Sequence, residues 1–225
     1  MRRHLLPRLL DRPSIAGLMA FRDEVGLGYT AFEVHELEVG APREAFDAEV
    51  AAAEEAGREG RIGEVGRARA LYRSFGTDPT RHRPSSEALL RRVKRSLGLP
   101  RINSLVDVAN LLSLQLQVPV GLYDLARVEG SELVIRLGRR GEGYAGIGKE
   151  HVNVEGRLCV ADAAGPCGNP SSDSARTMIT TTTTAAAWIF FLPVDDFALR
   201  RTAELIATHG RGLARFERPF VLAVL

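Results

Sequence analysis

The sequence has little of what marks membrane, secreted or metal-dependent proteins. Its two cysteines, Cys159 and Cys167, lie eight residues apart without the paired spacing of a zinc knuckle or redox motif, so we expect free thiols in a reducing compartment. No stretch approaches the run of about 18 apolar residues that a membrane helix needs. Pro7 and Asp11 interrupt the basic start of the chain, which therefore lacks the apolar core of a signal peptide. We expect a cytoplasmic protein with no membrane partner.

The sequence also has almost no excess of one charge. It contains 30 Lys and Arg against 28 Asp and Glu, which leaves a formal net charge of +2. This balance does not by itself indicate nucleic acid, so the distribution of charge matters more. No Gly-x-Ser-x-Gly elbow is present and neither cysteine has a histidine nearby, so a serine or cysteine hydrolase is not expected.

Two glycine motifs in residues 141–149 lack the strand and helix that nucleotide-binding motifs require. One matches GxGxxG, and the other begins like a P-loop but has Glu150 where Ser or Thr would hold magnesium. We interpret these glycines as hairpin turns and expect no cofactor and no metal.

The 225 residues, 45% of them apolar, predict a single globular domain over 1–225. Residues 1–70 would form an N-terminal strand and helix lobe after a basic lead-in, and residues 71–225 the core region. Period-two alternation in residues 29–39 predicts a strand that buries Phe32, Val34 and Leu37. Further strands are predicted at 132–137, 157–161, 186–192 and 218–225, helices at 43–58, 64–75, 86–97 and 196–209, and a loop at 163–174. This order predicts an α+β fold with helices packed on a largely antiparallel sheet.

The helix predicted at 86–97 carries the clearest charge bias of the chain. Ser85 is placed to cap it, Gly98 to end it, and apolar spacing predicts a buried face that includes Leu97. Its cationic residues and their neighbours are Arg81, Arg83, Arg91, Arg92, Lys94, Arg95 and Arg101. Such a cluster is suited to phosphate contacts, and it is equally typical of a solvated helix face. No aromatic residue interleaves it, so base stacking there is not predicted.

Residues 100–124 combine polar side chains with apolar spacing. Ser104 and Asp107 have the spacing of a capping box, and Asn110 follows one turn later, where it would fasten the following loop. We expect these residues to be structural. A row of threonines at 180–184 favours extended backbone and also offers hydroxyl groups to a ligand.

Several short segments, in the same order, resemble the B3/B4 domain of the phenylalanyl-tRNA synthetase β subunit. They are residues 102–110, 116–124, 128–130, 134–136 and 158–162. Residues 72–93 and the Arg176-Thr177 pair with the threonines after it look like free-standing B3/B4 proteins. The resemblance covers about residues 70–192. It implies a B3/B4-type α+β fold, and in the synthetase a pocket that hydrolyses tyrosine wrongly esterified to tRNA.

The resemblance implies a site as well as a fold. The predicted catalytic residues are Asp173 and Thr181, and the predicted substrate-binding residues are Gly121, Tyr123, Asp162, Thr177 and Thr183. The synthetase domain has a histidine in its Pro-Leu-His-Ala-Phe-Asp stretch where this chain has Gly121, so no catalytic imidazole comes from that position.

Three functions remain open at this point. The chain would be a deacylase that acts in trans on mischarged aminoacyl-tRNA, a non-catalytic RNA-binding module that uses the basic helix, or an amino-acid-binding protein. The partners implied are tRNA or aminoacyl-tRNA, with an amino acid moiety in the pocket and no DNA. The sequence does not give the oligomeric state.

Overall fold

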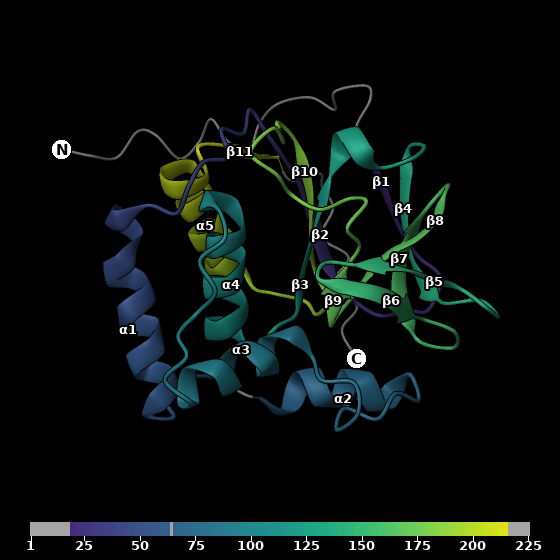
Figure 1. Ribbon diagram of the computed structural model, residues 1–225, viewed down its shortest axis with the longest axis horizontal. Coiled ribbons are helices and arrows are strands. Elements are labelled where there is room, and N and C mark those ends of the chain that lie inside the picture. The colour runs from purple at the N-terminus through teal and green to yellow at the C-terminus, as the bar shows by residue number, and fades with distance from the viewer. Residues whose placement is uncertain (1–18, 64, 216–225) are drawn as a thin grey trace.

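Helices, a four-stranded sheet and a five-stranded sheet form three successive layers in the computed structural model, which describes residues 19–63 and 65–215 (Figure 1). The helices are α1 (Asp47–Arg58), α2 (Gly66–Ser74), α3 (Ser85–Lys94), α4 (Ser104–Leu116) and α5 (Asp196–Leu205), with helical turns at Glu44–Phe46, Leu125–Arg127 and Ile206–Gly210. The strands are β1 (Ala20–Asp23), β2 (Thr30–His35), β3 (Val120–Asp124), β4 (Glu132–Leu137), β5 (Gly143–Gly146), β6 (Lys149–Asn153), β7 (Leu158–Asp162), β8 (Gly165–Asn169), β9 (Ser172–Asp173), β10 (Ala186–Phe190) and β11 (Leu213–Arg215). The predicted α+β class is confirmed.

The four-stranded sheet lies between two apolar cores. Its order is β11-β2-β10-β3, and all its pairs are antiparallel. Trp188 and Phe190 of β10 pack into the core under the helices, whereas Ala187 and Ile189 pack into the core between the sheets. Successive side chains of a strand point to opposite faces, so a strand that is buried on both faces is apolar throughout.

The five-stranded sheet has the order β1-β4-β7-β8-β9, with β1 parallel to β4 and the other pairs antiparallel. The predicted strand at 132–137 is confirmed as β4. The glycines of residues 141–149 belong to the β5-β6 hairpin, as predicted. The loop predicted at 163–174 is wrong, because β8 and β9 form a short hairpin that extends the sheet. The Gly, Pro and Ser residues of this segment favour a loop by composition. The segment forms strands because β8 pairs with β7 and with β9.

Helices α4 and α5 lie over the outer face of the four-stranded sheet, and α1 lies farther out against α4 (Figure 1). Helix α3 packs on α1 and α4, and α2 lies across one end of the sheets. The cap of α4 is Asn103, whose side chain accepts a hydrogen bond from the Val106 amide at 2.9 Å. The predicted capping box is therefore wrong. Ser104 instead accepts from the Gly40 amide at 3.1 Å, and Asn110 donates to Pro100 O at 3.4 Å, toward the preceding turn.

Helix α3 differs from its prediction at both ends. Pro84 occupies the cap position, and the buried Ser85 hydroxyl has no hydrogen-bond partner among the described residues. The helix ends at Lys94, because Ser96 adopts a left-handed backbone with φ of 56°. Leu97 is consequently 59% exposed, not part of the buried face.

None of the helices among the described residues is long and apolar enough to span a membrane. The predicted lead-in before Pro13 and the strand predicted at 218–225 fall outside the described residues.

Candidate functional site

A buried tyrosine and a half-buried aspartate meet between two glycines. Tyr123 of β3 is fully buried, and its hydroxyl and the Oδ1 atom of Asp173 both lack a hydrogen-bond partner among the described residues. A Cβ atom at Gly168 would lie 2.5 Å from the Tyr123 hydroxyl and 2.8 Å from Asp173 Oδ1. A Cβ atom at Gly121 would also lie 2.5 Å from that hydroxyl. We call these four residues the buried pair and its glycines.

This geometry explains why position 121 has no side chain. The Tyr123 hydroxyl occupies the space that any side chain at Gly121 would need. A histidine at 121 is incompatible with the observed position of Tyr123, because interiors are close-packed and do not accept an added ring without a large shift.

The carboxyl of Asp173 changes its protonation state when the pH changes near neutrality. Burial raises its pKa from 3.8 to about 7, and the Leu122 amide and the adjacent Tyr123 hydroxyl partly oppose that shift. The Leu122 amide lies 3.4 Å from Asp173 Oδ2. Burial likewise raises the pKa of the Tyr123 hydroxyl. Asp173 is therefore a proton acceptor of suitable strength, and its Oδ1 atom is buried.

Other predicted substrate-binding residues have their polar atoms engaged within the fold. Asp162 accepts both guanidinium nitrogens of Arg176 at 2.8 Å and backbone amides at 2.8 and 3.0 Å. Thr183 donates to Asp124 Oδ2 at 2.8 Å, and Thr177 donates to Cys167 O at 3.3 Å. Their roles toward a ligand stay predictions.

The threonine row does not form the predicted extended segment. Residues 181 and 182 form a turn, closed by the Thr183 amide donating to Thr180 O at 3.1 Å. Thr181 is exposed in this turn. It does not lie with Asp173 at the buried pair, and its catalytic role stays a prediction.

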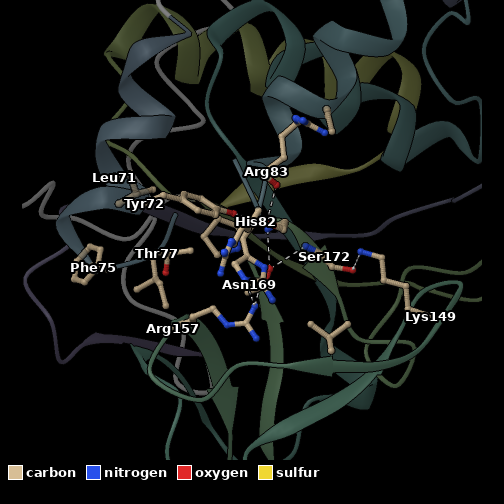
Figure 2. Close-up of a pocket in the computed structure, with 16 residues that line it drawn as sticks. Leu71, Tyr72, Phe75, Thr77, His82, Arg83, Lys149, Arg157, Asn169 and Ser172 are labelled. Carbon is tan, nitrogen blue, oxygen red and sulfur yellow. Dashed lines mark hydrogen bonds between the residues drawn. The ribbon is translucent and has the colours of Figure 1, made fainter. Parts of the chain in front are cut away.

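An open cavity of about 300 Å³ lies beside the buried pair, between α2, the segment before α3 and strands β6 to β9 (Figure 2). We call it the basic cavity. Its polar or charged lining residues are Tyr72, Thr77, Arg81, His82, Arg83, Lys149, Arg157, Asn169, Ser171 and Ser172. None of the described residues that line it is acidic. The cavity therefore presents hydrogen-bond donors and positive charge to whatever enters it.

The contacts inside the basic cavity fix several of its side chains. An Arg157 guanidinium nitrogen lies 2.9 Å from His82 Nδ1, and Lys149 Nζ lies 3.4 Å from the Ser172 hydroxyl. Ser171 donates to Arg83 O at 2.7 Å, so the Tyr72 hydroxyl next to Ser171 is the donor of their shared hydrogen bond. Partial burial and then the charge of Arg157 lower the pKa of His82.

The predicted RNA-binding residues divide into two groups. Arg81 and Arg83 line the basic cavity, and Arg91, Arg92, Lys94 and Arg95 are exposed on or just after α3. Arg101 differs from all of these. It pairs with Asp47 and with the buried Asp107, the latter at 2.7 Å, and so fastens the start of α4 to α1.

The exposed cations of α3 continue from the rim of the cavity. Ala88 lines the cavity, and positions three, four and seven residues later on a helix lie on the same side. These positions are Arg91, Arg92 and Arg95, which we call the α3 stripe. It extends over about 10 Å, given a rise of about 1.5 Å per residue.

Sequence reasoning missed most of the cavity. Tyr72, His82, Arg157 and Asn169 were not predicted as site residues, because they come from four separate segments that only the tertiary structure brings together (Figure 2). The adjacent residues Arg81, His82 and Arg83 are a weak signal for this cavity, because all three line it. Their charge alone indicates only a basic surface.

Comparison with known proteins gives the family of this chain. The model of the B3/4 domain matches residues 67–223. The β subunit of phenylalanine–tRNA ligase from Geobacter sulfurreducens is 29% identical over 146 residues, 63% of this chain and 18% of that protein. The same subunit from Anaeromyxobacter dehalogenans is 34% identical over 143 residues, 60% of this chain and 17% of that protein.

One solved structure, an N-terminal fragment of the phenylalanyl-tRNA synthetase β subunit from Pyrococcus horikoshii, matches 89% of this chain and 51% of its own, at 14% identity and a TM-score of 0.46. The chain spans less than a fifth of the length of both curated relatives named above. The match over residues 67–223 shows that this chain belongs to the B3/4 domain family.

Proposed function

We propose that this protein binds tRNA, with the phosphate backbone along the α3 stripe and the end of the RNA toward the basic cavity. The observation that carries the proposal is the continuity of the two features: a cavity with no acidic lining residue among those described, and a row of exposed arginines that leads away from its rim. The relatives are subunits of a tRNA ligase, which supports RNA as the polyanion.

The exposed arginines suit a phosphate backbone better than an isolated anion. Arg91 and Arg95 have no carboxylate partner among the described residues, so no ion pair must break when a phosphate binds. Each phosphate that is neutralised releases counterions, which makes binding strongly dependent on salt. A net charge of only +2 does not oppose this, because the charge is concentrated locally.

Filter binding of tRNA at several salt concentrations tests the proposal. The double variant Arg91→Glu with Arg95→Glu should bind at least tenfold more weakly and should lower the salt slope by about 2, one for each phosphate that is no longer neutralised. The matched control is Arg139→Glu with Arg140→Glu, which makes the same charge change at exposed positions between β4 and β5. Equal losses in both variants, or affinity independent of salt, would contradict the proposal.

A second function, hydrolysis of a mischarged aminoacyl ester, is favoured by Asp173, whose Oδ1 atom has no hydrogen-bond partner among the described residues. In this reaction Asp173 accepts a proton from water, the water oxygen bonds to the ester carbonyl carbon, and the bond from that carbon to the ribose oxygen breaks. The ribose oxygen then takes the proton. Because Asp173 Oδ1 is buried next to the Tyr123 hydroxyl, the Tyr123 side chain must move before an ester can approach this oxygen.

Incubation with a panel of mischarged tRNAs tests this second function. Wild-type protein should release the amino acid from at least one tRNA, and Asp173→Asn should lose that activity while still binding tRNA. Thr181→Val measures the contribution of the exposed hydroxyl. Ester loss no faster than in buffer for every tRNA would leave RNA binding as the function and remove the hydrolase.

A further inference from the structure

We propose that the basic cavity is a binding site for one nucleotide, whose phosphate lies against Arg157, His82 and Lys149. The shared chemistry is a nucleoside monophosphate unit, supplied either as a free nucleotide or as the terminal nucleotide of an RNA. As the terminal nucleotide of an RNA, this ligand rests on the proposed tRNA binding and names what enters the cavity. As a free nucleotide, it requires neither the α3 stripe nor any hydrolytic step.

Two cations face this cavity without a carboxylate partner. The Arg157 guanidinium donates to His82, and Lys149 approaches the Ser172 hydroxyl, but neither forms an ion pair within the described part of the chain. Two other arginines of this part of the fold are paired: Arg136 with Glu142 at 2.7 Å and Arg176 with Asp162 at 2.8 Å. Unpaired cations at a cavity with no acidic lining residue favour an anionic ligand, because charge-assisted hydrogen bonds to phosphate are strong and need no competing pair to break.

The contact with Arg157 also determines what His82 offers. The same guanidinium nitrogen lies 2.9 Å from His82 Nδ1 and 3.4 Å from Nε2. Guanidinium groups donate only, so we assign the closer nitrogen, Nδ1, as the acceptor and place the proton of the neutral imidazole on Nε2. Partial burial and the neighbouring charge lower the pKa of His82, so the imidazole remains neutral at physiological pH. His82 therefore supplies an N–H donor rather than a proton acceptor, which suits anion binding better than general base catalysis.

The other side of the cavity suits a base. Leu71 and Phe75 come from α2 and its C-terminal end, and Val152 and Leu158 come from β6 and β7. In Figure 2, Phe75 and Thr77 lie on one side of the cavity and Lys149 on the other, and Arg157 lies between them, nearer to Thr77. Aromatic and apolar walls pack against the faces of bases, which every nucleotide has.

The size of the cavity limits its occupant. A volume of about 300 Å³ is at the lower end of small-molecule sites, which span about 300 to 1,000 Å³. This space holds a single nucleotide and excludes a run of several.

Calorimetric titration of the full chain with AMP, adenosine and inorganic phosphate tests the proposal. AMP should bind at least tenfold more tightly than adenosine or phosphate alone, because it uses both sides of the cavity. Arg157→Gln should weaken AMP binding at least tenfold, and Phe75→Ala should weaken AMP binding but not phosphate binding. Arg139→Gln, an exposed arginine outside the cavity, is the matched control, and unchanged melting temperatures show that the variants are folded.

A short oligoribonucleotide separates the two sources of the nucleotide. If it displaces AMP, the source is an RNA terminus; if AMP binds and is not displaced, the source is a free nucleotide. Either result supports the site, provided that Arg157→Gln lowers the affinity for the ligand that binds. The proposal is overturned if neither AMP nor the oligoribonucleotide loses affinity in Arg157→Gln, or if AMP binds no more tightly than adenosine. Loss of tRNA binding in the α3 stripe variants with intact AMP binding would leave this site in place.

Discussion

The buried pair and the basic cavity lie on opposite sides of one short strand, β9. Ser172 of this strand lines the cavity, whereas the next residue, Asp173, faces Tyr123 in the interior. Within the described part of the chain, the cavity has hydrogen-bond donors and no acidic lining residue, and the Oδ1 atom of Asp173 is an acceptor without a donor. Each region lacks what the other has in excess. The difference shows that the cavity is open to a ligand in the observed fold, whereas the Oδ1 atom of Asp173 is buried.

The largest expected effect concerns the charge of Asp173. Its carboxyl has a pKa of about 7 when folded and an ordinary value of 3.8, so the folded state keeps a proton that the unfolded state loses. Stability should therefore fall as pH rises from about 4 to 7, with the full cost of about 4 kcal/mol present above pH 7. Chemical unfolding of wild type and Asp173→Asn across this range measures it. A wild-type curve parallel to that of the variant would mean that Asp173 is not buried as a carboxyl.

The next effect concerns the space around the Tyr123 hydroxyl. Gly168→Ala places a Cβ atom 2.5 Å from that hydroxyl and 2.7 Å from a ring carbon, so it should lower the free energy of unfolding by about 3 kcal/mol. Urea denaturation measures the loss. Gly66→Ala is the control, because no atom of the described residues lies within 4 Å of its added atom and its φ is not positive. A near-neutral result at Gly168 would show that Tyr123 moves readily, which would favour an interior that opens to substrate.

A buried carboxyl with all its partners should behave differently from Asp173. Asp162→Ala removes both bonds to Arg176 and leaves the amides of Glu129 and Ala164 without their acceptor. We expect a loss of about 2 kcal/mol in the free energy of unfolding. Differential scanning calorimetry compares it with Asp173→Asn at pH 8, where removal of an unpaired charge should stabilise the protein. Stabilisation by both substitutions would remove the distinction between the two carboxyls.

The smallest effect concerns His82 at the cavity. Its lowered pKa means that the imidazole gains its proton only at acidic pH, where it adds positive charge beside Arg157. Wild-type protein should therefore gain affinity for AMP, by less than tenfold, relative to His82→Gln when the pH falls from 7.5 to 5.5. Titration of both proteins at each pH cancels the protonation of AMP itself. An identical pH dependence in the two proteins would place the phosphate away from His82.

Much of the fold was predictable because its local patterns agree with its packing. Alternation in residues 29–39 gave Phe32 and Val34 as core residues, and both are almost fully buried. The predictions failed where long-range contacts replace local ones. The β8-β9 hairpin has loop composition, and Asn103 rather than Ser104 caps α4 because Ser104 bonds to Gly40, distant in sequence.

The candidate site was less predictable than the fold. Charge alone placed Arg101 with the cavity arginines, although Asp47 and Asp107 hold it in place. It gave no indication that Arg157 and His82 meet, since 75 residues separate them. The ionic partner of an arginine is set by the folded chain. Neighbouring arginines in one segment can therefore differ: some form ion pairs within the protein, and others remain free to bind a ligand.

By itself, the sequence determined the α+β class, the order of most elements and the missing side chain at position 121. Only the tertiary structure decided what that absence means: the Tyr123 hydroxyl occupies the space next to Gly121 and Gly168, beside the buried Oδ1 atom of Asp173. The physical reason is that secondary structure follows from local periodicity and burial, whereas a site follows from which side chains of distant segments share one volume. Close packing allows one occupant for each such volume, and here the protein's own tyrosine is that occupant.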